Sequence, residues 1–337
     1  MSKMAPASEP KALNAENRVE DLSGIEIKPD ENPYDALIKA CQGCPAKIQA
    51  SYDAHRTARN AQQRDRFLSS DFDGLTIDPI LLRLENPAIE PGFTDARNCF
   101  VFWARPPDHI LKLALHIQAL LQKAAPNLWL MPAQRMHLTT LEIAHSKTPE
   151  EIADLVSCVR PAIPALTSLP FRHRSRLVKP WLSYDLAAIA LSFLPAAGEK
   201  VLSPPPVQPH PDGIAHPGLL GEDTAETDKY TYHHLRRDVY KLVAETGVPI
   251  ASRYVVPSAH ITLGRFLSQK DHETPELRQH WIQTIDDINA WLENEVWGAK
   301  GGEFIGEWIV GQEKGLDARC GALWYGGGRT IMMGEGF

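Results

Sequence analysis

Two short stretches, MHLTT at residues 136–140 and AHITL at residues 259–263, share a histidine followed two residues later by a threonine. Both stretches favour strands, and residues two apart in a strand point to the same face of a sheet. Each histidine should therefore project beside its threonine. The candidate site residues are His137, Thr139, His260 and Thr262. A Thr-Pro-Glu sequence typical of a helix start follows each stretch, so the chain predicts the same unit twice.

The surrounding elements follow the same order in both halves. The first half predicts a strand at 98–104, a helix at 108–123, strands at 128–131 and 136–144, a helix after Thr148, and two strands within 177–194. The second half predicts a helix at 230–246, strands at 253–256 and 259–266, a helix at 274–297, and strands at 304–310 and 320–325. We therefore expect an α+β, bilobal, internally duplicated fold, with two mainly antiparallel sheets, outer helices and a central cleft.

The domain boundaries follow from the segments that do not fit this repeat. Residues 1–32 are polar and predict a disordered tail, and residues 33–97 predict an N-terminal helical and extended segment. Residues 98–337 form the predicted two-lobed domain, with lobe repeats at about 98–194 and 229–337. The proline-rich stretch 195–228 between the lobes predicts a linker or long surface loop.

Composition and charge exclude several classes of protein. The chain has 337 residues, 43% hydrophobic and 23% charged, which is typical of globular domains. A net charge of −7 argues against binding of long duplex nucleic acid, although it permits a small basic pocket. Five scattered cysteines argue against a disulfide-bonded secreted scaffold. No signal peptide or membrane-spanning run is evident. We expect a cytoplasmic monomer, with the nucleus as the alternative compartment.

Context separates the two strand motifs from chance matches. The His-x-Thr pattern occurs four times, and the other two copies begin at His55 and His272. His55 lies in a predicted helix, where residues two apart do not share a face, and the threonine after His272 is explained as a helix cap. Only His137 and His260 lie in apolar strands at matching places in the repeat.

The paired motifs resemble those of the 2H phosphoesterase superfamily, which includes RNA 2′,3′-cyclic phosphodiesterase/ligase proteins and cyclic nucleotide phosphodiesterases. The resemblance covers about residues 98–330, and Thr140 departs from the usual pattern because an apolar residue is commoner there. It implies metal-independent hydrolysis of a cyclic phosphodiester on a small cyclic nucleotide or RNA end, without a cofactor. His137 and His260 would serve as general base and general acid, in either order, and Thr139 and Thr262 would bind the phosphate.

Two other functions remain open from the sequence. One is a non-catalytic module that holds a nucleotide in the same cleft. The other is an RNA-end ligase or exonuclease of the same superfamily, which would bind longer RNA and should show a basic groove. ADP-ribose cyclic phosphate is an equally compatible small substrate.

Several further residues are weaker candidates. A basic stretch predicts a solvated loop rather than a phosphate site: Arg172, Arg174, Arg176 and Lys179. Arg265 is an odd number of residues from His260, so a regular strand would point it to the opposite face, and Arg135 could face either way. Four aromatic residues predict core positions, with base stacking as the alternative: Trp129, Trp181, Tyr184 and Tyr325. Cys41 and Cys44 predict free thiols, and no metal site is expected.

Overall fold

The structure is a computed structural model that describes residues 31–202, 228–253, 255–299 and 302–337. Apart from its last two residues, the predicted disordered tail lies outside the described residues, as do residues 203–227 of the predicted proline-rich loop. Asn32, the last residue of that tail, has a structural role. Its side chain accepts a hydrogen bond of 3.1 Å from the Tyr34 amide and so caps the first helix.

The helices begin where the sequence provides caps and prolines. The longer helices are α1 (Pro33–Ala40), α2 (Pro45–Leu68), α3 (Pro79–Glu85), α4 (Asp108–Ala124), α5 (Pro149–Val159), α9 (Tyr232–Ala244) and α10 (Pro275–Trp291). Shorter helical turns are η1 (Ala133–Arg135), η2 (Arg160–Ala162), α6 (Ile163–Thr167), α7 (Leu169–Arg172), η4 (Lys270–His272) and the π-helical turn η5 (Leu292–Val296). Proline occupies the first position of most long helices, where its missing N–H costs no hydrogen bond. The predicted helix start at Thr148 is confirmed, and Thr148 and Glu151 form a capping box there.

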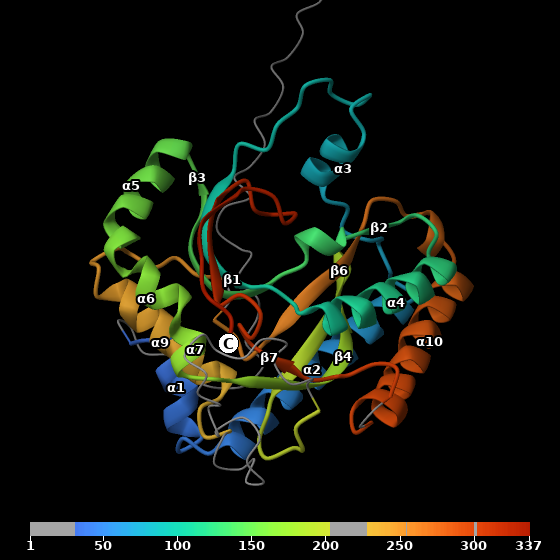
Figure 1. The fold of residues 1–337 in the computed structure, drawn as a ribbon. Helices are drawn as coiled ribbons and strands as arrows, with labels where there is room; N and C mark the ends of the chain where they lie inside the picture. Colours follow the sequence, from blue (N-terminus) through green and yellow to red (C-terminus); the bar gives the residue numbers. More distant parts are fainter. Residues whose placement is uncertain (1–30, 203–227, 254, 300–301) are drawn as a thin grey trace, which may run out of the picture.

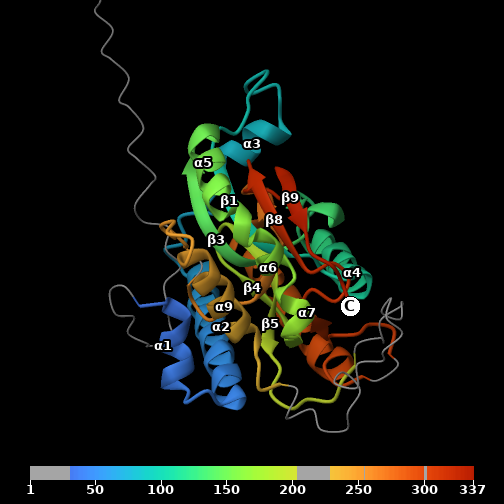
Figure 2. The same ribbon diagram turned by 60° about the vertical axis from the view of Figure 1, so that its left-hand side comes forward.

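All nine described strands belong to one antiparallel sheet (Figures 1 and 2). The strands are β1 (Asn98–Ala104), β2 (Leu128–Leu130), β3 (Leu138–Lys147), β4 (Arg176–Tyr184), β5 (Ala188–Pro195), β6 (His260–Phe266), β7 (Trp308–Ile309), β8 (Leu316–Gly321) and β9 (Arg329–Met333). Their order across the sheet is β7-β4-β5-β6-β3-β1-β8-β9, and β2 pairs with the outer part of β6.

The predicted α+β class is confirmed, whereas the prediction of two separate sheets is wrong for the described strands. The two halves of the sheet are joined where β3 meets β6, at the single pair Leu138↔Ile261. The predicted lobes at 98–194 and 229–337 do not match these halves, and the duplication is not confirmed. β4 and β5 pair with β6, while β8 returns to pair with β1. Strand partners far apart in the chain leave no local pattern in the sequence.

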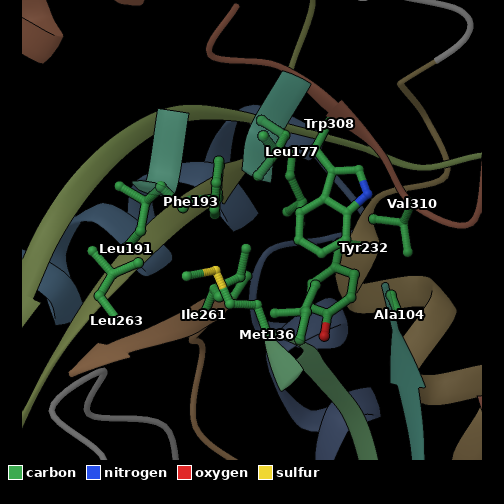
Figure 3. Close-up of a cluster of buried hydrophobic side chains, with 14 of the residues drawn as sticks. Ala104, Met136, Leu177, Leu191, Phe193, Tyr232, Ile261, Leu263, Trp308 and Val310 are labelled. Atoms are coloured by element: carbon green, nitrogen blue, oxygen red, sulfur yellow. The ribbon is translucent and has the colours of Figure 1, made fainter. Parts of the chain in front are cut away.

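The main core lies on one face of this sheet (Figure 3). Figure 3 shows side chains from several strands packed together, among them Leu191, Ile261 and Leu263. The amphipathic helix α4 covers this face, and the Gln118 side chain on α4 donates hydrogen bonds to the backbone oxygens of Met131 and Leu263. Because strand side chains alternate, the residues between these apolar ones point to the opposite face.

The N-terminal segment is packed against this domain. Figure 2 shows α1, α2 and α9 side by side, and buried hydrogen bonds connect them. The Tyr52 hydroxyl on α2 lies 2.8 Å from Nδ1 of His233 on α9. Nε2 of the same histidine lies 3.1 Å from the backbone oxygen of Tyr34 on α1. Within the predicted helical and extended segment 33–97, the structure has the helices α1, α2 and α3.

Two strand predictions near the C-terminus are corrected by the structure. Residues 304–310 form a strand only at Trp308–Ile309. The strand predicted at 320–325 lies earlier in the chain, because β8 runs from Leu316 to Gly321. Asp317 on β8 is fully buried, which breaks the apolar pattern that sequence analysis relied on. No described residue in 253–256 belongs to a strand.

One described segment, Pro149–Arg172, is long and apolar enough by composition to span a membrane. It is not a single uninterrupted helix, because it comprises α5, η2, α6 and α7. Its apolar residues Ile152, Val156 and Val159 are buried, and α5 packs on β1, β3 and β8. These contacts are those of a helix packed on a sheet.

Candidate active site

The two His-x-Thr motifs meet at the centre of the sheet. Leu138 on β3 pairs with Ile261 on β6 in antiparallel register, so each motif's histidine lies next to the other motif's threonine across the pair. Leu138 and Ile261 are buried in the core face. The four polar side chains of the motifs are half-buried and belong to the opposite face. The structure therefore brings the two predicted motifs side by side on one face of the sheet.

A cavity of about 1020 Å³ opens on this opposite face. Thr139, His260 and Thr262 line it, together with outward-facing residues of β5 such as Ser192. The other wall is α2, which contributes side chains such as Tyr52, Arg59 and Gln63 to the lining. This volume lies just above the range of about 300–1,000 Å³ typical of small-molecule sites.

His137 is held beside this cavity and does not line it. Its ring stacks on the Trp103 ring, with centroids 3.7 Å apart and planes 15° apart. Its Nδ1 lies 2.7 Å from the backbone oxygen of Arg135. A carbonyl can only accept, so Nδ1 carries the proton, and Nε2 of the neutral ring can accept one. Burial lowers the pKa of His137 to about 3, and the positive charge of Arg105 acts in the same direction.

His260 lies in the cavity wall at the start of β6. Its Nδ1 lies 3.0 Å from the Ser258 hydroxyl, which can donate or accept. Burial lowers the pKa of His260 to about 4, and the nearby positive charges of Arg59 and Arg236 add to this effect. The two histidines also affect each other, because a charge on His260 lowers the pKa of His137. Both pKa values lie far enough below 7 that both rings are neutral at pH 7.

Ser192 is a site residue that sequence analysis missed. It pairs with His260 across β5 and β6, so the two side chains share a face. Its hydroxyl donates to the Trp181 backbone oxygen at 2.8 Å and accepts from the Ser183 hydroxyl at 2.9 Å. Ser192 sits in an apolar strand segment, and only the pairing with β6 reveals its place.

Arg265 lies on the histidine face, and the prediction that it would point away is wrong. From Ala190 to Ile189 on β5 the partner on β6 moves from Thr262 to Gly264, which leaves Leu263 as an extra residue. Such a bulge reverses the alternation beyond it, so Arg265 joins His260 and Thr262 in lining the cavity.

Other arginines in the cavity come from outside the motifs. Sequence analysis did not assign the following to the site: Arg56, Arg59, Arg66, Arg236 and Arg253. Arg59 on α2 forms an ion pair of 2.8 Å with Asp185, beyond the end of β4. The only sequence signal for Arg59 was the high arginine content of this helix. His55, discounted as a chance match, also lines the cavity, but it does so from the helix.

The basic stretch is not part of the cavity, although its expected solvation is wrong for Arg176. Arg176 is buried and forms ion pairs with Asp228 and Glu307, each with a 2.7 Å contact. Arg172, Arg174 and Lys179 are more exposed and do not line the cavity. Arg135 is exposed and also outside the lining.

The remaining candidates divide between core and cavity. Tyr184 lines the cavity, whereas Trp129, Trp181 and Tyr325 do not. Trp324, which was not predicted, contributes to the lining. Cys41 and Cys44 are free thiols, and within the described ranges no three His, Cys, Asp or Glu residues form a group that could hold a metal ion.

Comparison with known proteins does not assign the chain to a family. No protein-family model and no curated protein matches it. The evidence for its function is therefore the geometry of the site.

Proposed function

We propose that this protein hydrolyses a cyclic phosphodiester, either a 2′,3′-cyclic nucleotide or a cyclic phosphate at an RNA end, by acid–base catalysis with two histidines. The observation that carries the proposal is the antiparallel pairing of the two motifs at Leu138↔Ile261 beside an arginine-lined cavity. This pairing supports the resemblance to the 2H phosphoesterases, whose two motifs act together.

The proposed reaction is attack of water on phosphorus with departure of a ribose oxygen. One histidine takes the proton from water while the other donates a proton to the leaving oxygen. His137 is suited to the base role because its Nδ1–H is bonded to the Arg135 carbonyl, which leaves Nε2 to accept the proton. His260 then acts as the acid. Every proton transfer in this scheme is assigned to a side chain.

The negative charge on the phosphate would be held by neutral and charged donors. The hydroxyls of Thr139 and Thr262 can donate to the non-bridging oxygens, and these two residues lie on either side of the central strand pair. A bound phosphate would also favour the protonated form of His260, since a nearby negative charge raises the pKa of an imidazole. Substrate binding thereby favours the charged form of His260 that the proposed reaction needs as its acid.

The test is hydrolysis of 2′,3′-cyclic AMP in the presence of EDTA. We expect turnover by the native protein and a loss of kcat/KM of roughly 10²- to 10⁴-fold in both His137→Ala and His260→Ala. His280→Ala is the matched control, because His280 is exposed on α10 and outside the cavity. Nucleotide binding without turnover would replace the proposal with a binding module. Turnover retained in both His137→Ala and His260→Ala would refute the assignment of the histidines.

A further inference from the structure

The cavity is lined by more basic than acidic side chains. Six arginines line it, against the two acidic residues Asp65 and Asp185: Arg56, Arg59, Arg66, Arg236, Arg253 and Arg265. A single cyclic phosphate carries one negative charge, and two threonines and two histidines already face it in the proposed function. The excess of arginines therefore points to more negative charge in the ligand.

Three of these arginines have protein partners that explain them. Arg56 pairs with Asp53 at 2.8 Å, and Arg253 makes two contacts with Glu142 at 2.9 and 2.5 Å. Arg236 is fully buried, and its guanidinium donates to backbone oxygens and to the Tyr34 hydroxyl. These three side chains have structural roles, since their donors are used within the protein.

Arg265 differs from them. Its Nε is buried and has no hydrogen-bond partner among the described residues. No carboxylate of the described residues forms an ion pair with its guanidinium. Its guanidinium lies 5.7 Å from the centre of the Tyr325 ring. A buried donor without an acceptor is unfavourable, and more so in a charged group, so such a group is a candidate for binding a ligand.

Arg59 provides a second guanidinium on the opposite wall. It projects from α2, and the ion pair with Asp185 fixes its position at 2.8 Å while leaving other N–H groups to donate. Both Arg59 and Arg265 lie near enough to His260 for their charges to lower its pKa. The two walls of the cavity thus place one arginine each beside the same histidine.

We propose that Arg265 and Arg59 form a subsite for a second phosphate group of the substrate, separate from the cyclic phosphate at the motifs. This inference rests on the proposed function and specifies its substrate class: a cyclic phosphate on a nucleotide that carries another phosphate. That group is either a 5′-phosphate of a mononucleotide or the internucleotide phosphodiester of an RNA end.

The experiment compares three substrates that differ in this second phosphate. They are adenosine 2′,3′-cyclic phosphate, the same compound with a 5′-phosphate, and the dinucleotide ApA ending in a 2′,3′-cyclic phosphate. We expect kcat/KM to be roughly 10- to 100-fold higher for one of the two doubly phosphorylated compounds, the value of a charge-assisted hydrogen bond. Preference for the 5′-phosphorylated compound identifies the terminal phosphate as the ligand, and preference for the dinucleotide identifies the phosphodiester.

In the variants Arg265→Gln and Arg59→Gln, the ratio of kcat/KM between the preferred doubly phosphorylated compound and adenosine 2′,3′-cyclic phosphate should fall toward one. Arg64→Gln is the matched control, because Arg64 lies on the same helix but pairs with Asp286 and does not line the cavity. Equal kcat/KM for all three substrates, or an unchanged preference in both cavity variants, would overturn the subsite while leaving the hydrolase proposal intact.

Equilibrium binding separates the two proposals. The dissociation constants of the same three compounds are measured by calorimetry on His260→Ala. The subsite is supported if His260→Ala binds a doubly phosphorylated compound more tightly than adenosine 2′,3′-cyclic phosphate and if adding Arg265→Gln abolishes this difference. This result supports the subsite even if the native protein hydrolyses none of the three compounds. Equal or absent binding of all three compounds, together with no hydrolysis, would refute the subsite.

Discussion

At the scale of single residues, the two histidines differ in what holds their Nδ1 atoms. His137 donates to a carbonyl, which fixes its tautomer, whereas His260 faces the Ser258 hydroxyl, which permits either one. Both pKa values lie far below the ordinary value of about 6.5, mainly because the rings are buried. The sequence could place these residues on one face, but not predict these shifts, which depend on packing against Trp103 and on Arg59.

The shifts predict an unusual pH dependence of kcat/KM, which reports the free enzyme. With a pKa of about 4, His260 is protonated in only about one molecule in a thousand at pH 7. We expect kcat/KM to rise up to about tenfold per unit as the pH falls from 7 to 5. The falling limb of kcat should lie at higher pH, because bound phosphate raises the pKa of His260.

This profile is measured with 2′,3′-cyclic AMP between pH 5 and pH 8. Both histidines have a lower pKa in the folded chain than in the unfolded chain. Their contribution to the free energy of unfolding is therefore fully present above about pH 6.5 and is lost as the pH falls toward 4. The folded fraction is therefore followed by circular dichroism at each pH. A bell-shaped kcat/KM profile centred near pH 6.5 would contradict the expectation.

At the scale of elements, the sequence predicted helix starts better than strand geometry. The capping box of Thr148 and the cap at Thr274 are local signals, and both helices begin where expected. The bulge at Leu263 leaves no such signal, since it depends on how β6 pairs with β5. This one extra residue puts Arg265 on the histidine face, whereas regular alternation predicted the opposite face.

Gly264, next to this bulge, allows β2 to approach β6. A Cβ atom at this position would lie 2.8 Å from the backbone oxygen of Trp129 and 3.1 Å from the Leu128 side chain. We expect Gly264→Ala to lower the free energy of unfolding by about 1–3 kcal/mol, because the backbone of β2 must shift. It should also lower kcat/KM by moving Arg265.

The free energy of unfolding is measured by urea denaturation. Gly298→Ala is the control, because nothing lies within 4 Å of the Cβ it would add. Equal effects of the two substitutions on unfolding would show that the β2–β6 contact has no special requirement for glycine.

At the scale of the whole molecule, the site depends on contacts between distant parts of the chain. The sequence predicted that the two motifs meet, because both are His-x-Thr patterns in strands at matching places in the predicted repeat. It did not predict that α2 would form the opposite wall or that one sheet would join both halves. Both features arise from packing between segments more than 100 residues apart, such as the hydrogen bond of Asn60 to the Leu182 oxygen.

The buried ion triad around Arg176 is the clearest of these long-range connections. Arg176 on β4 binds Asp228 and Glu307. The same carboxylates accept hydrogen bonds from the backbone N–H groups of Gly198 and Leu202. One guanidinium thus connects β4 with residues on both sides of 203–227 and with the chain before β7.

Removing this guanidinium should cost far more than removing a surface charge. Arg176→Met leaves two buried carboxylates without their partner, and we expect the free energy of unfolding to fall by about 3–5 kcal/mol. Lys147→Met is the comparison, since its ion pair with Glu151 is exposed and solvent-exposed ion pairs contribute little to stability. Urea denaturation at pH 7 measures both. If the two substitutions cost the same, the triad does not hold these segments together, and the fold must rely on apolar contacts of β4 with β5 and β7 instead.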